Sequence, residues 1–453
     1  MTSGSPIKKI ILFSLPLIIG NIFQLFYNMV DTFIVGRTMG VNALAGIGAA
    51  GSIMFFVVGF SQGFTAGTAI PTAQAFGAQD YEKVSRSVAI NWVLSTLVVI
   101  VMTLFSMYFL WDILHLMNTP TEIIQYTYDY LVIIFGFMAV TILFNMLSNL
   151  MRAIGNSRTP VIALVLAVIL NIILDYVFIL VFNMGAAGVA IATIISQFVA
   201  SMVCLTYINT KLYTLRLKRK HFKLRKEEVL HHCRIGFPMA FQTSIISIGS
   251  MSVSIALNRI GTEAVAGYAA SQKIDQVVVF ILMSFGVAMA TYVGQNYGAK
   301  KYDRIIKGVS QITKLSVAVA ILAAVILFIY GGNLTSIFGD SDSKAILTEY
   351  GQFFFRLTGP FYWLLAILFI FRYTLQGLGD SFVPTLAGVM ELIMRVVAAF
   401  VLSHYYGFLG PALSNPLAWF GALIALVPAY IKRSKELEQR HHEQLLHQVE
   451  QSP

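Results

Sequence analysis

Long apolar blocks separated by short polar stretches extend over most of the chain. Soluble domains average about 25% charged residues, and a run of roughly 18 or more apolar residues is typical of a membrane-spanning helix. Here 57% of the 453 residues are hydrophobic and only 11% are charged. The pattern predicts an all-α polytopic membrane protein and excludes a porin-like barrel, whose strands would appear as short alternating segments.

Twelve apolar blocks are long enough to cross a bilayer. The first is too long for a signal-peptide core and lacks a small-residue cleavage site, so we expect it to be retained. The predicted transmembrane helices are 10–36, 45–71, 87–111, 122–150, 161–182, 186–210, 234–258, 264–292, 306–330, 346–376, 383–404 and 409–431.

Positive charge is distributed unevenly over the loops between these spans. With both termini placed in the cytoplasm, 23 of the 31 Lys and Arg residues fall on the inner side and 3 on the outer side, namely Arg37, Arg259 and Lys344. This bias follows the positive-inside rule and supports an even number of spans with cytoplasmic termini. The net charge of +10 therefore reflects mostly topology. It does not indicate nucleic-acid binding, which would need a soluble basic fold.

Two polar segments interrupt or end the apolar pattern. Residues 211–233 form a basic cytoplasmic linker, which either only anchors the topology or also touches anionic headgroups. Residues 432–453 form a polar cytoplasmic tail that need not be ordered. These segments delimit an N-lobe at 1–210 and a C-lobe at 234–431.

Short motifs recur along the chain at an offset of about 221–224 residues. The matched pairs are Pro16 with Pro238, the segments that begin at Arg37 and Arg259, Gly77-Ala78 with Gly298-Ala299, Gly155…Pro160 with Gly379…Pro384, and Gly188-Val-Ala190 with Gly410-Pro-Ala412. Five matches in the same order predict two pseudo-symmetric six-helix bundles. Folds of this kind bind substrate near the bilayer midplane between the repeats and alternate its access.

Two acids lie inside apolar spans of the N-terminal half. An acid at the centre of a span costs about 2.5–3.5 kcal/mol on insertion scales, so Asp31 and Asp175 mark an ion site or a pathway. Gln24 and Asn28 precede Asp31 at helical spacing, and Asn171 precedes Asp175 by four residues. Neither acid recurs in the second half, so packing shared by both halves does not explain them. The pattern predicts a cation-driven transporter.

Taken together, these residues resemble the multidrug and toxic compound extrusion (MATE) family. The resemblance covers essentially the whole chain and rests mainly on Ser14-Leu-Pro16 followed by Asp31, on the Gly77-Ala78 end of the second span, and on the Gly155…Pro160 loop. Family members export organic cations and other amphipathic compounds in exchange for Na⁺ or H⁺. The resemblance thus implies a secondary active multidrug efflux antiporter with rocker-type alternating access, without a cofactor and without enzymatic activity.

The resemblance also implies a cation site in the N-lobe. In one branch of the family its ligands come from the first, fifth and sixth spans, with a Tyr from the fourth span nearby. The matching residues here are Asp31, Asn171, Asp175, Thr193 and Tyr130. Two carboxylates, an amide oxygen and a hydroxyl are donors that suit Na⁺. The two acids could instead carry protons, and the choice between Na⁺ and H⁺ stays open.

Five charged residues lie within spans of the second half: Lys273, Asp275, Arg372, Glu391 and Arg395. Glu391 and Arg395 are four residues apart, so they can pair on one helix face. Lys273 and Asp275 are two apart and cannot face each other, so each needs a partner on another helix. These two residues serve either as a clamp between helices or in transport. Another branch of the family places essential acids in spans seven and ten, a pattern that this half lacks.

Residues that contact the substrate are harder to identify. Met side chains adapt to varied ligands, and aromatic faces attract organic cations. The candidate cavity residues are Gln24, Tyr27, Asn28, Phe55, Gln62 and Met283. We expect cationic or amphipathic drugs and membrane lipids as partners, no nucleic acid, a monomeric state, and a location in the plasma membrane.

Three other functions compete with drug antiport. A lipid-linked precursor or polysaccharide flippase of the same superfamily is the nearest, although such proteins often carry extra spans and a more basic cavity. A membrane enzyme would need a nucleophile, metal or acid–base motif, and the sequence contains no HExxH, GxSxG or Walker motif. A passive channel is the third alternative. Counterflow of drug against an ion gradient would exclude it.

Overall fold

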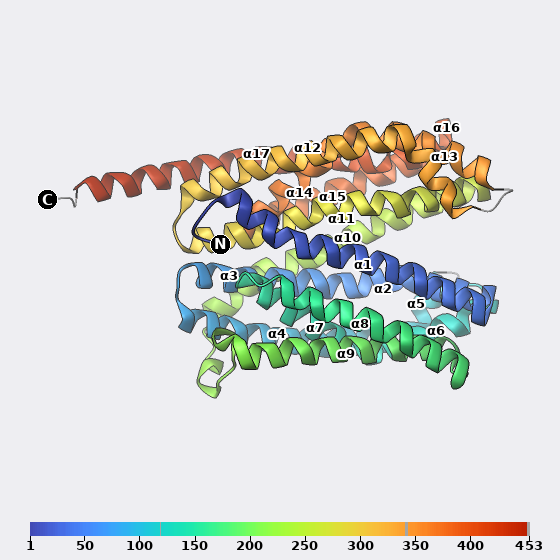
Figure 1. The fold of residues 1–453 in the computed structure, drawn as a ribbon, viewed down its shortest axis with the longest axis horizontal. Helices are drawn as coiled ribbons and strands as arrows, with labels where there is room; N and C mark the ends of the chain where they lie inside the picture. The colour runs from blue at the N-terminus through green and yellow to red at the C-terminus, as the bar shows by residue number, and fades with distance from the viewer. Residues whose placement is uncertain (118, 340–342, 451–453) are drawn as a thin grey trace. The chain divides into compact units, whose positions relative to one another are not determined.

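Helices account for nearly all of the chain in the computed structural model, which describes residues 1–117, 119–339 and 343–450 (Figure 1). The N-terminal half contains α1 (Pro6–Met39), α2 (Val41–Thr68), α3 (Ile70–Gly77), α4 (Tyr81–Tyr108), α5 (Leu110–Leu116), α6 (Thr121–Gly136), α7 (Met138–Ala153), α8 (Arg158–Tyr176) and α9 (Gly185–Lys211). The C-terminal half contains α10 (Lys226–Ile260), α11 (Thr262–Gly298), α12 (Tyr302–Thr335), α13 (Lys344–Thr358), α14 (Tyr362–Gly377), α15 (Phe382–Val397), α16 (Ser403–Tyr406) and α17 (Leu409–Glu450). No strand occurs in these described ranges.

The helices account for the spans expected from the apolar pattern. Eleven helical segments are long and apolar enough to cross a membrane, and the pair α6 and α7, bent by 54°, supplies a twelfth. Each predicted span falls on one of these segments, so the prediction of a twelve-helix membrane protein is confirmed.

The chain forms two compact units. One comprises Leu15–Ser244, and the other comprises Met1–Ser14 together with the chain from Ile245 onward. Phe64, Leu131 and Phe135 are buried in the core of the first unit, and Phe354 and Tyr362 are buried in the core of the second. The chain passes from one unit to the other inside α1 and inside α10, so these two helices belong partly to each.

Both halves carry the same two irregularities. The fourth span is broken at Phe137 in the first half and at a short 3₁₀ turn, Gly359–Phe361, in the second. The fifth span ends in a π-helical turn in each half, Val177–Val181 after α8 and Ala398–Leu402 after α15. These matching breaks support the internal repeat that the sequence motifs indicate.

The polar linker and the polar tail are both more helical than the composition suggests. The linker contains two 3₁₀ turns, Tyr213–Leu215 and Arg219–Phe222, and α10 already begins at Lys226. Glu227 and Glu228 lie in the first turn of α10, where negative charge stabilises the positive end of the helix dipole. The irregular connection is therefore shorter than the predicted 211–233.

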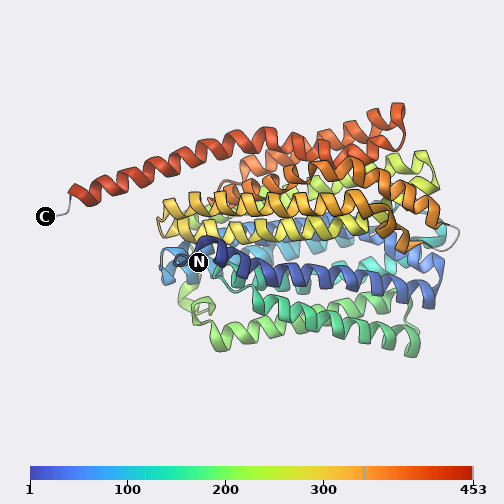
Figure 2. The ribbon, with the colours of Figure 1, turned by 45° about the horizontal axis from the view of Figure 1, so that its top comes forward.

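In the tail, α17 continues through the whole polar segment as far as Glu450, and Figures 1 and 2 show its last turns extending beyond the other helices of the same unit. Arg433 pairs with Glu436 at 2.7 Å and with Asp380 at 3.1 Å. Arg440 donates a hydrogen bond to the hydroxyl of Tyr297 at 3.0 Å. These contacts tie the helical tail to α11 and to the loop before α15.

Candidate functional site

The predicted cation-site residues come from four helices of the first unit. Asp31 lies on α1, Tyr130 on α6, Asn171 and Asp175 on α8, and Thr193 on α9. α9 packs against both α8 and α6, which brings three of these helices together. The fourth helix, α1, approaches α8 at Gly20.

The approach of α1 to α8 is close because Gly20 has no side chain. A Cβ at position 20 would lie 3.2 Å from the Val161 Cγ1 atom, which is tighter than an ordinary van der Waals contact. Glycine therefore allows the α1 backbone to lie against α8. This contact lies in the same unit as Asp31 and Asp175, on the two helices that carry them.

The structure brings the two acids of the first unit into contact. The carboxyl groups of Asp31 and Asp175 interact directly, and Asp175 is fully buried. Among the described residues, none donates a hydrogen bond to Asp31 Oδ1 or to either carboxyl oxygen of Asp175. The side chain of Asn171 is also buried and makes no hydrogen bond within the described chain. Three carboxyl oxygens of the two acids thus lack a partner, as do both polar side-chain atoms of Asn171, one helical turn before Asp175.

Two tyrosines and a threonine line the same cluster. The hydroxyl of Thr193 donates to the Val189 carbonyl oxygen at 3.0 Å, so its oxygen is free to accept from other donors. The hydroxyls of Tyr27 and Tyr130 both interact with Thr193, and both rings lie within electrostatic range of Asp31 and Asp175. All the residues proposed for the cation site except Asn171 therefore have recorded interactions within one cluster.

Tyr27 is a member of this cluster that the sequence interpretation assigned instead to the substrate cavity. It lies on α1, four residues before Asp31, so the two side chains share one helix face. Helical spacing from Asp31 was the available signal for its role. Gln24 and Asn28, on the same helix, have no recorded interaction with the acids; Gln24 is half-buried and Asn28 is exposed.

The other candidate cavity residues are divided between the two units. Phe55 and Gln62 are exposed on α2 of the first unit, whereas Met283 is half-buried on α11 of the second unit. Two pockets of the first unit contain none of the six candidates. One is a groove on α9, and the other, of about 170 Å³, lies between the starts of α4 and α10.

The charged residues of the second unit form compensated contacts. Glu391 accepts a hydrogen bond from Arg372 of α14, and its other oxygen lies 3.8 Å from Arg395. The predicted Glu391–Arg395 pair is therefore confirmed, with Arg372 as an additional partner. The hydroxyl of Tyr362 on α14 donates to Asp275 on α11 at 2.6 Å, which supplies the partner expected on another helix.

Lys273 differs from the other four charges of this group. Its side chain is exposed, and it has no ion pair among the residues that the structure describes. A partner on another helix was expected because a buried cation is costly. A long Lys side chain at the surface of the unit can extend its ammonium group towards water, which lowers that cost without a partner.

A bound transition metal is not supported by the side chains. The described part of the chain contains no group of three or more His, Cys, Asp or Glu residues arranged to hold a metal ion. The cluster around Asp31 and Asp175 instead offers two carboxylates, an amide and hydroxyls, which are ligands for a hard monovalent cation or acceptors for a proton.

Comparison with known proteins identifies the fold and the family. The family model MatE matches twice, at residues 16–177 and 238–401, in agreement with the internal repeat. The chain is 26% identical over 433 residues to the probable multidrug resistance protein YoeA of Bacillus subtilis, covering 93% of each chain. It is 29% identical over 443 residues to the probable multidrug resistance protein NorM of Thermotoga maritima, covering 93% of this chain and 89% of the relative.

A solved structure shows the same fold. The crystal structure of MATE in complex with MaL6 superimposes with a TM-score of 0.89 at 21% identity, covering 96% of this chain and 98% of the other. The twelve-helix architecture, the tandem family match and these relatives agree with one another. The protein therefore belongs to the MATE family of membrane transporters and is not an enzyme.

Proposed function

We propose that the protein is a secondary active multidrug efflux antiporter that exchanges organic cations and amphipathic compounds for Na⁺ or H⁺. Family membership and the multidrug resistance names of YoeA and NorM support drug export as the activity. The charge bias of the loops supports cytoplasmic termini, and the bacterial relatives support a plasma-membrane location. We expect the protein to work as a monomer without a cofactor.

The observation that carries the coupling proposal is the set of buried, unpartnered polar atoms around Asp31 and Asp175. A buried donor or acceptor without a hydrogen bond costs about 1–3 kcal/mol, and more when it is charged. Two carboxyl groups in contact also repel each other when both are ionised. A cation or a proton bound between them removes both costs, so the cluster is suited to reversible cation binding.

The chemistry of the cluster is compatible with two coupling ions. Oxygen donors from Asp31, Asn171, Asp175 and Thr193 form a set that Na⁺ prefers. A single proton shared by the two carboxyl groups would serve as well. The antiport mechanism is the same for either ion. Imposing a Na⁺ gradient and a pH gradient separately shows which ion drives transport.

In the proposed cycle, the cation binds at Asp31 and Asp175 from the outside, where its electrochemical potential is higher. Cation binding lowers the affinity for the drug, which leaves to the outside. Return to the inward-facing state by a rocking motion of the lobes releases the cation into the cytoplasm. The coupling is reciprocal, so drug binding must weaken cation binding by the same factor.

The test is transport of ethidium, an organic cation, in vesicles that contain the purified protein. Na⁺ and pH gradients are imposed separately on the parent and on the variants Asp31→Asn and Asp175→Asn. We expect one gradient to drive ethidium transport in the parent and neither gradient to do so in the variants. Transport that persists in both variants would contradict a coupling role for these acids. No gradient-driven transport of any organic cation would instead favour the lipid-linked precursor flippase.

A further inference from the structure

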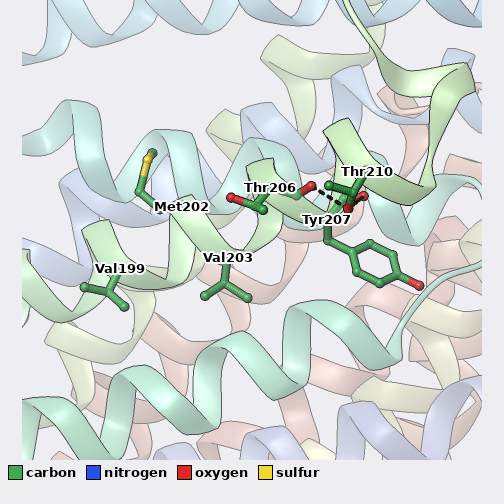
Figure 3. A pocket seen from close by; sticks show the side chains of 6 residues that line it. All are labelled: Val199, Met202, Val203, Thr206, Tyr207 and Thr210. Atoms are coloured by element: carbon green, nitrogen blue, oxygen red, sulfur yellow. Dashed lines mark hydrogen bonds between the residues drawn. The ribbon is translucent and has the colours of Figure 1, made fainter.

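An open apolar groove of about 440 Å³ runs along α9 (Figure 3). Its lining residues recur at helical spacing on one face of that helix: Val199, Met202, Val203, Thr206, Tyr207 and Thr210. At a rise of about 1.5 Å per residue, this stripe is about 16 Å long, roughly half of a hydrocarbon core about 30 Å thick. The groove therefore matches one leaflet of a bilayer in length.

The lining of the groove offers few polar groups to a ligand. Val199, Met202 and Val203 offer only apolar surface. At the far end, the hydroxyl of Thr210 donates to the carbonyl oxygen of Thr206 at 2.8 Å, as Figure 3 shows. The Thr210 hydroxyl therefore already has an acceptor within the helix. We infer that an apolar chain suits the groove.

The guanidinium group of Arg216 lies near the end of the groove that Thr210 lines. Arg216 folds back so that its Nη2 donates to the carbonyl oxygen of Asn209, the residue before Thr210. Its guanidinium lies 4.1 Å from the centre of the Tyr213 ring. The Nε atom is buried without a partner, and no acidic side chain of the described chain pairs with Arg216. A guanidinium with free donors is well suited to a phosphate group.

The surrounding linker carries further positive charge that acids do not neutralise. Lys211, Lys218 and Lys220 are exposed and form no ion pair in the described ranges. Of the two nearest acids in the sequence, Glu228 is already bound to Arg86 at 3.1 Å, and Glu227 is exposed and pairs with none of these lysines in the described ranges. Burial, followed by the effect of Lys220 and Lys218, lowers the pKa of His221 below its usual value.

We propose that this surface is a binding site for an anionic phospholipid, with one acyl chain in the α9 groove and the acidic headgroup at Arg216 and the linker lysines. Two features of the molecule meet at the end of α9. One is the apolar groove, which is one leaflet long, and the other is a group of basic side chains without ion pairs among the described residues. An anionic lipid complements both, whereas a zwitterionic lipid complements only the groove. The site is separate from the cation cluster, so the proposal does not depend on the transported substrate.

The test measures lipid binding to the full-length protein in detergent by native mass spectrometry. The probes are phosphatidylglycerol and phosphatidylcholine with the same acyl chains, and glycerol phosphate as a headgroup without chains. A basic residue near a membrane surface contributes about 1 kcal/mol to binding an anionic lipid, or about fivefold in affinity. We expect phosphatidylglycerol to bind at least fivefold more tightly than phosphatidylcholine, and glycerol phosphate not to bind measurably.

Two variants separate the headgroup from the acyl chain. Arg216→Gln should lower phosphatidylglycerol affinity about fivefold and leave phosphatidylcholine unchanged. Its matched control is Lys435→Gln, which removes an exposed cation from α17. Val203→Trp should fill the groove and weaken both lipids, with Val325→Trp on exposed α12 surface as its control.

Each outcome decides the proposal. Equal binding of the two lipids, or equal effects of Arg216→Gln and Lys435→Gln, would overturn the assignment of the headgroup site. Binding of glycerol phosphate as tight as that of the lipid would overturn the role of the groove. If Val203→Trp does not fold, Thr206→Phe at the next turn of the same stripe provides the second test of the groove.

Discussion

The two halves of the molecule repeat one fold but treat their buried acids in opposite ways. In the first unit, Asp31 and Asp175 contact each other, and their buried oxygens receive no hydrogen bond from the described residues. In the second unit, Glu391 lies between two arginines, and Asp275 accepts from Tyr362 at 2.6 Å. One unit leaves its acids without a hydrogen-bond donor among the described residues, and the other neutralises them with its own side chains.

The repeat locates part of this difference in one turn of the fifth span. Gly155 and Gly379 are equivalent at an offset of 224 residues, and the two family matches end at 177 and 401 with the same offset. The π-helical turns that follow α8 and α15 match at an offset of 221 instead, so Asn171 corresponds to the turn of α15 from Leu392 to Arg395. Where this turn of the second half carries a permanent positive charge, the first half carries a neutral amide.

The largest effect is expected from neutralising the acids of the first unit. Asp31→Asn and Asp175→Asn should each lower gradient-driven ethidium transport at least tenfold, because an amide cannot exchange a cation or proton. Neither change should lower the thermal unfolding temperature, since each removes a buried charge that lacks a partner. Initial transport rates and melting curves of the purified variants check both parts. Transport within twofold of the parent would contradict the prediction.

Neutralising Glu391 should produce the opposite pattern. Glu391→Gln leaves Arg372 and Arg395 buried without a counter-charge, and breaking a buried pair in this way costs about 3–5 kcal/mol. We expect a clear fall in the unfolding temperature. The matched control removes all three charges together, with Arg372→Met, Glu391→Leu and Arg395→Met, and should recover much of the stability. An unfolding temperature of Glu391→Gln equal to that of the parent would show that the ion pairs of Glu391 with Arg372 and Arg395 do not stabilise the fold.

A smaller loss of stability is expected at the second compensated acid. Tyr362→Phe removes the hydroxyl that donates to Asp275 and keeps the ring, which packs near Trp419. A hydrogen bond to a charged group contributes about 1.5–3 kcal/mol. The unfolding temperature should fall, while the number of cations exchanged per drug should stay unchanged. A change in that stoichiometry, measured from reversal potentials in vesicles, would give Asp275 a role in coupling.

The smallest effect is expected from the hydroxyl in the cation cluster. Thr193→Val removes one oxygen ligand and keeps the side-chain shape, which should weaken the apparent affinity for the coupling cation by up to about tenfold. The maximal transport rate should change little. Thr96→Val is the matched control, because Thr96 is exposed on α4 and its hydroxyl also bonds to the carbonyl oxygen four residues before it. Equal effects of the two changes would exclude a ligand role for Thr193.

The sequence predicted the features that depend on local pattern. Apolar blocks located all twelve spans, and the isolated acids Asp31 and Asp175 marked the cluster, because an unpaired charge in a span is costly whatever surrounds it. The i, i+4 spacing also predicted the Glu391–Arg395 pair, which the structure contains.

Features that depend on distant contacts could not be predicted in the same way. Tyr362 is 87 residues from its partner Asp275, so no spacing rule connects them. The helical course of the tail depends partly on contacts of Arg433 with Asp380 and of Arg440 with Tyr297, which lie far apart in the sequence. Exposure of Lys273 likewise follows from the packing of whole helices and not from the residues next to it.

The most direct test of the contrast between the two units is cation release on drug binding. Ethidium is added to purified protein in weakly buffered detergent solution, and the released H⁺ or Na⁺ is measured for the parent, for Asp31→Asn with Asp175→Asn, and for Tyr362→Phe. Reciprocal coupling predicts release from the parent and from Tyr362→Phe, and none from the double variant. Release from the double variant equal to that of the parent would contradict a coupling site at Asp31 and Asp175.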